Sequence, residues 1–423
     1  FFKIYCLVSK ILLQNPIGKY LIQSPFLIER KDFIFNNFKL PRYKIFVASK
    51  YEQDESKLNN EEKNLLAKDL IKSLKLSLED GLSENNFNES ILWKMNCERN
   101  FKEIKKFVFS NDHISLAKYL DQMFQKDCLE GISASAKIIG MEGKTDLTLN
   151  FYTVQSIYFL SEYLGIIPSK SLAISSQLPN HRIDVNHTVE FLLEEIEKII
   201  PIKISQKIHS GVSGLKINRR IISPDLIEHL YTAIRVKELL NNNSIVNASK
   251  KFDSKSYSLL EIGAGFGDLC SFSNQILTKQ LAYFIIDLPF VNLIQGWFLS
   301  NTLGRDKILL YSDLVDNFSN FKLEKNSCLD KVILIPSSKQ KELRLPELDL
   351  IINQDSFAEM DTNTVRSYLK EYLGSTNPGA KLYSVNQESQ TWASQVIGEF
   401  KLSRIQRSKS WIMPEYIEEI YKI

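Results

Sequence analysis

Apolar residues at helical spacing dominate the first half of the chain. Between residues 61 and 78, leucine recurs at every fourth position from Leu66 to Leu78, which places these side chains on one face of a helix. Asn59 can cap the start of this helix and Gly81 can end it. Similar patterns, the last opening with Ser-Pro-Asp, predict further helices over residues 90–109, 112–124, 153–164, 187–200 and 223–240.

Two glycine-punctuated stretches interrupt these helices. Residues 131–151 contain alternating runs at 136–141 and 146–151, which predict a hairpin or an irregular loop. Residues 202–217 alternate as a strand or an extended loop does. We expect short helices and loops before residue 60.

The second half of the chain changes pattern after a polar stretch at residues 241–256, where short apolar runs begin to alternate with helices. Strands are predicted at 258–262, 281–286, 307–311, 348–353 and 379–385, with a shorter one at 332–336 and a last extended piece at 401–411. Helices are predicted at 268–278, 289–303, 362–373 and 387–398. This alternation predicts an α/β fold with a doubly wound parallel sheet over residues 246–423. Residues 1–245 are expected to form a mostly helical cap that recognises the substrate.

Composition narrows the class of protein. The chain has 423 residues, 44% of them hydrophobic, and 53 basic against 50 acidic side chains give a formal charge of +3. This charge is too small to favour a nucleic-acid partner. Five scattered cysteines and five scattered histidines predict free thiols, no metal site and a reducing, cytoplasmic location.

No stretch of the sequence has the length and apolarity of a transmembrane helix. The apolar opening, residues 1–13, is short and interrupted by Lys3 and Lys10, so we expect an amphipathic helix there. The chain begins with Phe1 rather than Met, and the sequence leaves open where the natural protein begins.

A glycine turn follows the first strand of the second half. Gly263, Gly265 and Gly267 form G-x-G-x-G, with Glu261 two residues ahead. Dinucleotide-binding folds instead use G-x-G-x-x-G, whose helix faces a pyrophosphate. Asp287 ends the second strand, 24 residues after Gly263, where an acid can accept hydrogen bonds from ribose hydroxyls.

The turn resembles motif I of the class I S-adenosylmethionine-dependent methyltransferases, in which an acid precedes three alternating glycines. The resemblance implies S-adenosylmethionine as the cofactor, with Glu261 accepting from its ammonium group and Asp313, after the predicted third strand, near its adenine amine. The full set of cofactor-binding residues is expected to be Glu261, Gly263, Ala264, Gly265, Gly267, Asp287, Leu288, Asp313, Asn353 and Gln354.

A closer resemblance, to the sugar O-methyltransferase family, lies downstream of the turn. The resemblance rests on two motifs: Ile-Asp-Leu-Pro at residues 286–289, and the family segment N-x-x-S-F-x-E-M, which is matched here at residues 353–360. Residues 211–240 also resemble the segment that precedes the family's catalytic domain. The resemblance implies O-methylation of a sugar or glycan precursor.

Methyl transfer to a hydroxyl needs a base beside the acceptor. Asp355 and Glu359 follow the fourth core strand, where they can wall the pocket together with Asn353 and Gln354, and they share a face if the segment is helical. His229, on the helix that precedes the second domain, is the best histidine candidate.

Three alternatives stay open at this point. The same fold could methylate another small molecule at nitrogen or oxygen. An NAD(P)-dependent oxidoreductase is disfavoured by the glycine spacing, and a non-catalytic binding protein is disfavoured by the intact turn with its acids. The sequence does not determine the acceptor, the base or the oligomeric state.

Overall fold

The computed structural model describes residues 43–47, 55–78, 91–133, 140–167, 187–207, 209–223, 225–241, 256–277, 281–317, 323–389, 391–413 and 415–423. The predicted N-terminal amphipathic helix, Gly81 and most of the polar stretch 241–256 lie outside these residues. Within them, no helix has the length and apolarity needed to cross a membrane.

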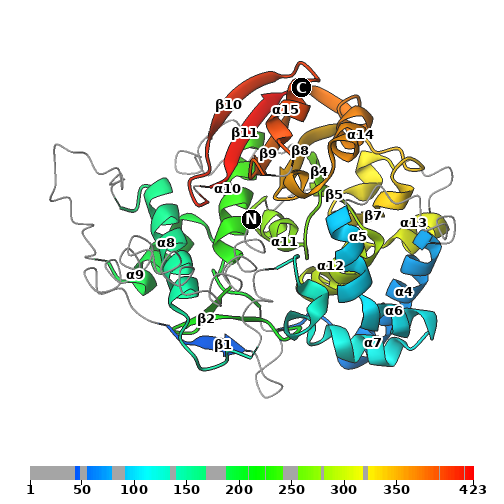
Figure 1. Cartoon of the computed structure of the whole chain (residues 1–423), viewed down its shortest axis with the longest axis horizontal. Helices are drawn as coiled ribbons and strands as arrows, with labels where there is room; N and C mark the ends of the chain where they lie inside the picture. The colour runs from blue at the N-terminus through cyan, green and yellow to red at the C-terminus, as the bar shows by residue number, and fades with distance from the viewer. Residues whose placement is uncertain are drawn as a thin grey trace, which may run out of the picture.

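A central eight-stranded sheet has the order β10-β11-β9-β8-β4-β5-β7-β6 (Figure 1). Five neighbouring strands, β9, β8, β4, β5 and β7, run parallel, and β6 adds a short parallel edge. Strands β11 and β10 extend the other side of the sheet in antiparallel register. The strands are β4 (Tyr257–Ile262), β5 (Leu281–Asp287), β6 (Ile308–Leu309), β7 (Lys331–Pro336), β8 (Leu348–Gln354), β9 (Thr376–Asn386), β10 (Ser403–Lys409) and β11 (Ile417–Lys422).

Helices cover both faces of this sheet, as alternating side chains along the buried strands require. Residues such as Leu259 and Ile285 face a core built with α10 (Leu226–Asn241), α11 (Asp268–Leu277) and α12 (Pro289–Leu303). Leu260, Phe284 and their equivalents face α13 (Tyr311–Asn317), α14 (Thr362–Tyr372) and α15 (Ala393–Gly398). The predicted doubly wound α/β fold is confirmed.

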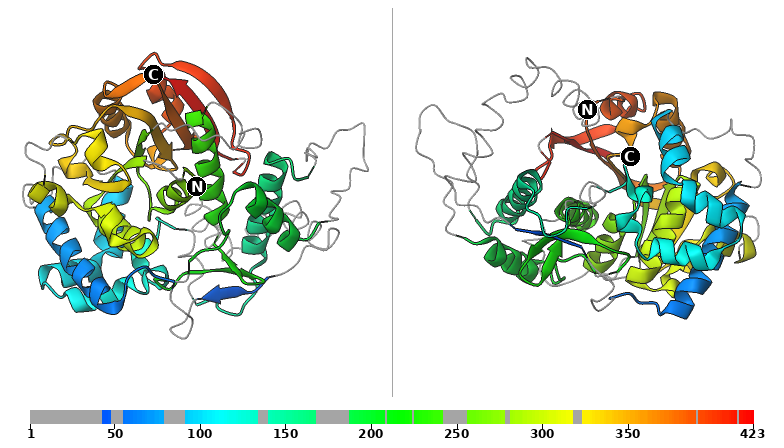
Figure 2. Two further views of the ribbon diagram at one scale, coloured as in Figure 1. Left: turned by 180° about the vertical axis from the view of Figure 1, so that it is seen from behind. Right: turned by 60° about the horizontal axis from the view of Figure 1, so that its bottom comes forward.

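Helices from the first half of the chain pack directly on this sheet domain. They are α4 (Asn60–Leu78), α5 (Ile91–Asn100), α6 (Lys102–Phe109), α7 (His113–Leu120), α8 (Leu147–Tyr163) and α9 (Val189–Ile199). A small antiparallel sheet of β1 (Ile45–Val47), β2 (Ser213–Ile217) and β3 (Arg220–Ile222) accompanies them. Helices α4, α6 and α7 lie at one end of the molecule and α8 and α9 at the other (Figure 2).

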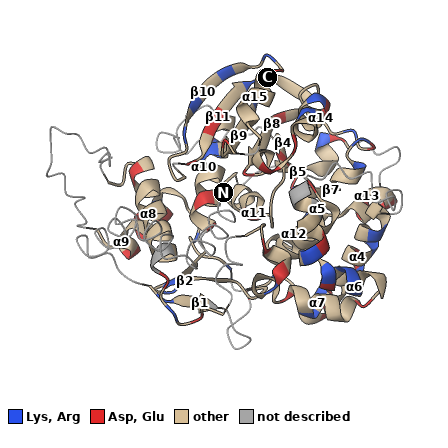
Figure 3. Cartoon of the chain, in the orientation of Figure 1, with Lys and Arg blue, Asp and Glu red and all other residues tan. Residues whose placement is uncertain are grey.

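The leucine stripe predicted for α4 is buried against α12 and α13, and Asn59 accepts hydrogen bonds from the Glu61 and Glu62 backbone as the predicted cap. Figure 3 shows Lys and Arg interspersed with Asp and Glu along α4 and α6.

The division of the chain into two domains near residue 245 stays a prediction. One continuous apolar core includes residues from both sides of that boundary.

Several predicted elements are wrong in detail. The strand beside β5 is β7 rather than residues 307–311, of which only Ile308 and Leu309 pair, at the outer edge. Strand β11 was not predicted at all. The run at 146–151 is helical, since Asp146 caps α8 by accepting from the Leu149 amide. The helix predicted over 90–109 is broken at Phe101, and those predicted over 112–124 and 387–398 are shorter, at α7 and α15.

Candidate functional site

The glycine turn connects β4 to α11 at the carboxyl edge of the sheet. Gly263, Gly265 and Gly267 have φ of 74°, 57° and 100°, values that favour glycine. A Cβ on Gly263 would lie 2.2 Å from the Ser356 hydroxyl oxygen, and one on Gly267 would lie 3.1 Å from Leu299. The turn is therefore packed from two sides: Gly263 has no room for a side chain, and a side chain at Gly267 would require Leu299 to shift.

Asp287, at the end of β5, is tied to this turn. Its Oδ2 accepts hydrogen bonds from the Ala264 amide at 2.9 Å and from Gln295 Nε2 at 2.8 Å, and its Oδ1 accepts from the Leu288 amide at 2.8 Å. Gln295 is fully buried and also donates to the Gly265 carbonyl at 2.8 Å. Burial raises the pKa of Asp287 to about 7, although the three hydrogen bonds lower it. The carboxylate is thus fixed beside the turn, and Asp287 as a whole is half-buried.

Glu261 lies beneath the turn, as the sequence predicts. Its side chain is buried, and its Oε2 accepts a hydrogen bond of 2.7 Å from the Tyr283 hydroxyl on β5. Burial raises the pKa of Glu261 to about 7, and the Tyr283 hydrogen bond and His229 counteract that rise. Its predicted contact with a ligand ammonium stays a prediction.

Asn353 lies at the carboxyl end of β8 beside the glycine turn, and its predicted contact with the cofactor stays a prediction. Its side chain is fully buried, and its Nδ2 donates to the Ile262 carbonyl at 2.8 Å and to the Ser356 hydroxyl. Its Oδ1 accepts from Asn386 Nδ2 at 2.8 Å. The amide therefore joins the carboxyl ends of β4, β8 and β9 and holds Ser356 against Gly263.

Gln354 follows Asn353 and is partly exposed. Its Oε1 is buried and has no hydrogen-bond partner among the described residues. A buried carbonyl oxygen without a donor is costly, so this atom marks a place where a ligand donor would be stabilised.

The two candidate acids after β8 face different elements. Residues Phe357–Glu359 form a single 3-10 turn, and Asp355 precedes it with φ of 57°, so the shared helical face does not form. Asp355 is a hydrogen-bond partner of Tyr416, whereas Glu359 Oε2 accepts from Trp93 Nε1 on α5 at 2.8 Å.

His229 lies in a cluster of carboxylates at the same edge of the sheet. Its Nδ1 is 3.4 Å from Oδ2 of Asp268, the first residue of α11, and Gln206 Nε2 donates to the same oxygen at 3.1 Å. Burial lowers the pKa of His229, but Asp268, Asp225 and Glu228 outweigh it and raise the value to about 9. At neutral pH the imidazole is therefore a cation held by Asp268.

Glu228 links this cluster to the segment after β8. Burial raises its pKa to about 8, the carboxylates of Asp225, Asp355 and Glu415 add to the rise, and His229 opposes it. Two of the three predicted catalytic residues, His229 and Asp355, are thus brought to one cluster, and Glu359 is not.

Asp313 lies away from these residues. Its Oδ2 is 3.0 Å from Arg305 and accepts from the Leu310 amide at 2.8 Å, which makes it a capping and ion-pair residue at the start of α13. It follows the edge strand β6 rather than β7, the strand beside β5. The expected contact with adenine stays a prediction.

Sequence reasoning missed Gln295, Tyr283 and the acids around His229. Asp268 could have been predicted from the sequence, because it directly follows Gly267 and is the first residue of the predicted helix 268–278. Gln295 sits two turns into α12, and only the packing of that helix against the glycine turn brings it to Asp287.

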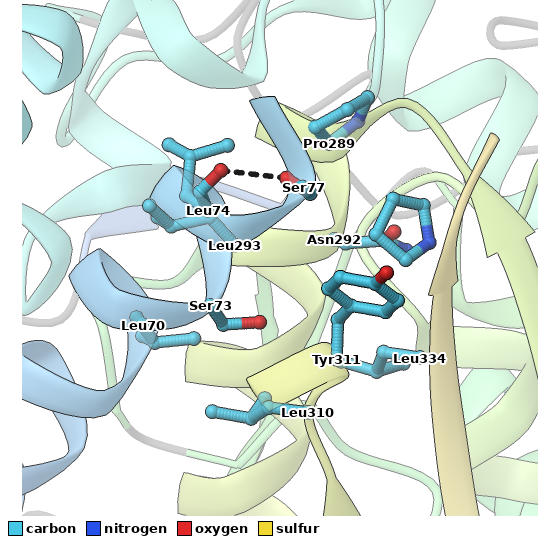
Figure 4. Close-up of a pocket in the computed structure, with 11 residues that line it drawn as sticks. Leu70, Ser73, Leu74, Ser77, Pro289, Asn292, Leu293, Leu310, Tyr311 and Leu334 are labelled. Atoms are coloured by element: carbon cyan, nitrogen blue, oxygen red, sulfur yellow. Dashed lines mark hydrogen bonds between the residues drawn. The ribbon is translucent and has the colours of Figure 1, made fainter. Parts of the chain in front are cut away.

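A cavity of about 10 Å³, room for about one water molecule, lies behind this edge between α4, α12 and β7 (Figure 4). Asn292, which lines it, has a buried Oδ1 without a hydrogen-bond partner among the described residues. The cavity is too small for a nucleotide. Across the residues that the structure describes, no three His, Cys, Asp or Glu side chains gather as metal ligands would.

Neither a family model nor a curated protein matches the chain. Among solved structures, the mitomycin 7-O-methyltransferase MmcR is similar over 47% of this chain and 55% of its own, with 14% identity and a TM-score of 0.30. The chain thus spans about half the length of that protein.

Two further structures are similar to the chain. A SAM-dependent methyltransferase from Aquifex aeolicus matches over 46% and 90% of the two chains, with 14% identity and a TM-score of 0.29. The O-methyltransferase from Bacillus cereus in complex with SAH matches over 46% and 91%, with 11% identity and a TM-score of 0.28. At these values, the assignment of function depends on the geometry of the site.

Proposed function

We propose that this protein is an S-adenosylmethionine-dependent methyltransferase. The observation that carries the proposal is the hydrogen bond that joins Asp287, a half-buried residue at the end of β5, to the Ala264 amide in the tight turn Gly263–Gly267. Such a turn and acid, at the carboxyl edge where β4 and β5 end, form the nucleoside-binding corner of an open α/β sheet.

The residues at this corner fit the cofactor. The left-handed glycine backbone allows close approach of its amino-acid end, and the unpartnered Gln354 Oε1 is an acceptor suited to its ammonium group. Asp287 would accept from the ribose hydroxyls, with Leu288 beside it. Glu261 adds negative charge beneath the turn. The bound cofactor would supply a methyl group already activated on a sulfonium.

We propose that the molecule that receives the methyl group binds beside the cluster around His229. His229 is a candidate base for an acceptor hydroxyl only after it has lost its own proton, so with a pKa of about 9 this role requires a pH above neutral. In that neutral form Asp268 holds Nδ1, and Nε2 is the nitrogen that takes the proton. Asp355 is the second candidate base. Glu359 would act through Trp93 by positioning α5.

The acceptor is proposed to be a hydroxyl of a sugar or glycan precursor. Asp225, Glu228 and Asp268 present carboxylates near His229, and Asp355 lies near Glu228. Carboxylates are suitable acceptors for several sugar hydroxyls at once. Because α10 supplies Glu228 and His229, and Asp225 directly precedes this helix, the first half of the chain would contribute to substrate recognition.

The excess of carboxylates around one histidine also favours a second candidate acceptor, an amine that the carboxylates would bind as a cation. Its nitrogen would give a proton to one of these carboxylates before it takes the methyl group. Methyl transfer to sugar hydroxyls and to amines can be compared with labelled cofactor. Incorporation into amines alone would overturn the sugar assignment while leaving the methyltransferase assignment in place.

Calorimetry tests the cofactor directly. The chain should bind S-adenosylhomocysteine and not NADH. Asp287→Asn should weaken that binding by about tenfold or more, because the ribose hydroxyls lose a charged acceptor. Asp316→Asn, which changes an exposed carboxylate on α13, is the matched control and should leave the affinity unchanged. Binding of NADH, or no binding by a folded protein, would exclude the proposed function.

A further inference from the structure

A pocket of about 380 Å³ lies beside Asp268, separate from the glycine turn. It is bounded by the first turns of α11, the end of α12 and two segments from the first half of the chain, residues 55–57 and 203–207. Its volume is within the range of small-molecule sites. Ser56 fastens the first segment to Asn301 on α12 with a hydrogen bond of 2.5 Å, so the wall is built from elements distant in sequence.

Three lysines line this pocket: Lys57, Lys203 and Lys207. Two carboxylates line it as well, and both are engaged. Glu55 lies 3.6 Å from Lys203, and Asp268 accepts from Gln206 and faces His229. Among the described residues, no carboxylate lies within ion-pair distance of Lys57 or Lys207.

Lys207 is the most constrained of the three. Its Nζ donates to the Thr302 carbonyl at 3.2 Å, which fixes the ammonium group at the wall. Burial lowers the pKa of Lys207, the positive charge of Lys57 lowers it further, and Glu55 opposes both effects. Lys207 is half-buried and Lys57 is exposed at the pocket mouth, and an anion bound between them would reduce the repulsion between their two charges.

Polar side chains beside the lysines complete a suitable lining. Ser271 and Gln275 on α11 both line the pocket. Gln275 Nε2 donates to the Ser271 hydroxyl oxygen at 3.3 Å, so the hydroxyl hydrogen of Ser271 is the neutral donor that this pair offers a ligand. Ammonium groups on flexible stems bind phosphate as point charges, and neutral donors orient its oxygens. Phe298 adds an apolar wall that would exclude water from one side of a ligand.

We propose that this pocket binds a phosphate-bearing ligand, with Lys57 and Lys207 holding the phosphate and Lys203 at the rim. The site is distinct from the proposed cofactor corner and does not depend on methyl transfer. Asp268 is shared, since it lines the pocket and holds His229.

Isothermal titration calorimetry of the full chain with inorganic pyrophosphate, at constant ionic strength, tests the proposal. One pyrophosphate should bind per chain. Lys57→Gln and Lys207→Gln should each weaken binding by about tenfold, the effect of removing one charge-assisted contact. Lys207→Arg keeps the charge and should retain most of the affinity. Lys370→Gln, which changes an exposed lysine on α14, is the matched control.

Equal losses in the Lys370→Gln control, unchanged binding in both pocket variants, or no binding at all would overturn the proposal. Far-UV circular dichroism checks that each variant is folded. Parallel titrations with uridine diphosphate distinguish the source of the phosphate, because tighter binding than pyrophosphate identifies a nucleotide and equal binding identifies the phosphate groups alone. Saturation with S-adenosylhomocysteine should not compete, which separates this test from that of the proposed function.

Discussion

The most constrained residue of the candidate site is Gly263. Its neighbours form a closed set of contacts, in which Asn353 orients Ser356 and the Ser356 hydroxyl donates to the Ile262 carbonyl at 2.9 Å. The glycine and Asp287 could be predicted from the sequence, because their spacing is local. Gln295 and Asn386 could not, because their contacts depend on how α12 and β9 pack against the turn.

Gly263→Ala should destabilise the protein by about 2–4 kcal/mol, since the left-handed backbone strains any side chain and the new methyl group would collide with Ser356. Urea denaturation measures the loss. Gly374→Ala is the matched control, because nothing lies within 4 Å of its Cβ position. Similar losses in the two variants would contradict the packing described for the turn.

The ion pair of His229 with Asp268 should make the stability of the protein depend on pH. Its pKa in the folded protein, about 9, is above the ordinary value of 6.5, so the Asp268 pair stabilises the fold fully below pH 6.5, and this contribution is lost as the pH rises through 9. NMR titration of the histidine ring signals should show one histidine with a pKa near 9 that is missing in His229→Gln. Asp268→Asn should lower that pKa.

The carboxylates of Asp225 and Glu228 also face His229, so the value in Asp268→Asn should stay above that of a solvated imidazole. His113, for which a conservative His113→Gln variant leaves this cluster intact, serves as the control. A His229 pKa near 6.5 in the unmodified chain would contradict the described ion pair.

At the scale of elements, the strand that sequence reasoning missed shows why periodicity was insufficient. Strand β11 reads Ile-Glu-Glu-Ile-Tyr-Lys, and its two glutamates indicate a solvated segment. Both glutamates are buried. Glu418 is held by Arg235 and by the Tyr231 hydroxyl at 2.7 Å, both on α10, so a tertiary ion pair overrides the pattern. The reverse error occurred at residues 307–311, where apolar composition predicted a core strand and only an edge pair formed.

Arg235→Met should cost about 3–5 kcal/mol of stability, because it leaves the Glu418 carboxylate buried without its cation. Glu418→Gln in the same chain should recover part of the loss. Arg366→Met breaks a solvent-screened surface pair with Glu399 and should cost much less stability than Arg235→Met. Chemical denaturation gives the free energy of unfolding of the three variants. Equal losses of stability in Arg235→Met and Arg366→Met would mean that the buried pair stabilises the fold no more than the surface pair does.

At the scale of the whole molecule, the sequence pattern predicts a helical first half and an α/β second half. It does not indicate how closely the two halves pack. Leu70 on α4 comes so close to α12 that a Cβ on Gly296 would lie 2.6 Å from its Cδ2. Such contacts join residues more than two hundred positions apart, and no local pattern carries them. The same packing brings His229 and Trp93 to the carboxyl edge of the sheet.

If α4 and the sheet share one core, they should unfold together. Leu70→Ala should then destabilise the protein by about 2–5 kcal/mol and shift the urea transitions of far-UV circular dichroism and of tryptophan fluorescence equally, since Trp297 lies in α12 within that core. Leu65→Ala, on the exposed face of the same helix, should change stability by about 0.5 kcal/mol or less. Two separate transitions, with Leu70→Ala moving only one of them, would instead mean that the first half of the chain folds as an independent cap, and the acceptor cluster on α10 would then be assembled by docking two bodies rather than built into one.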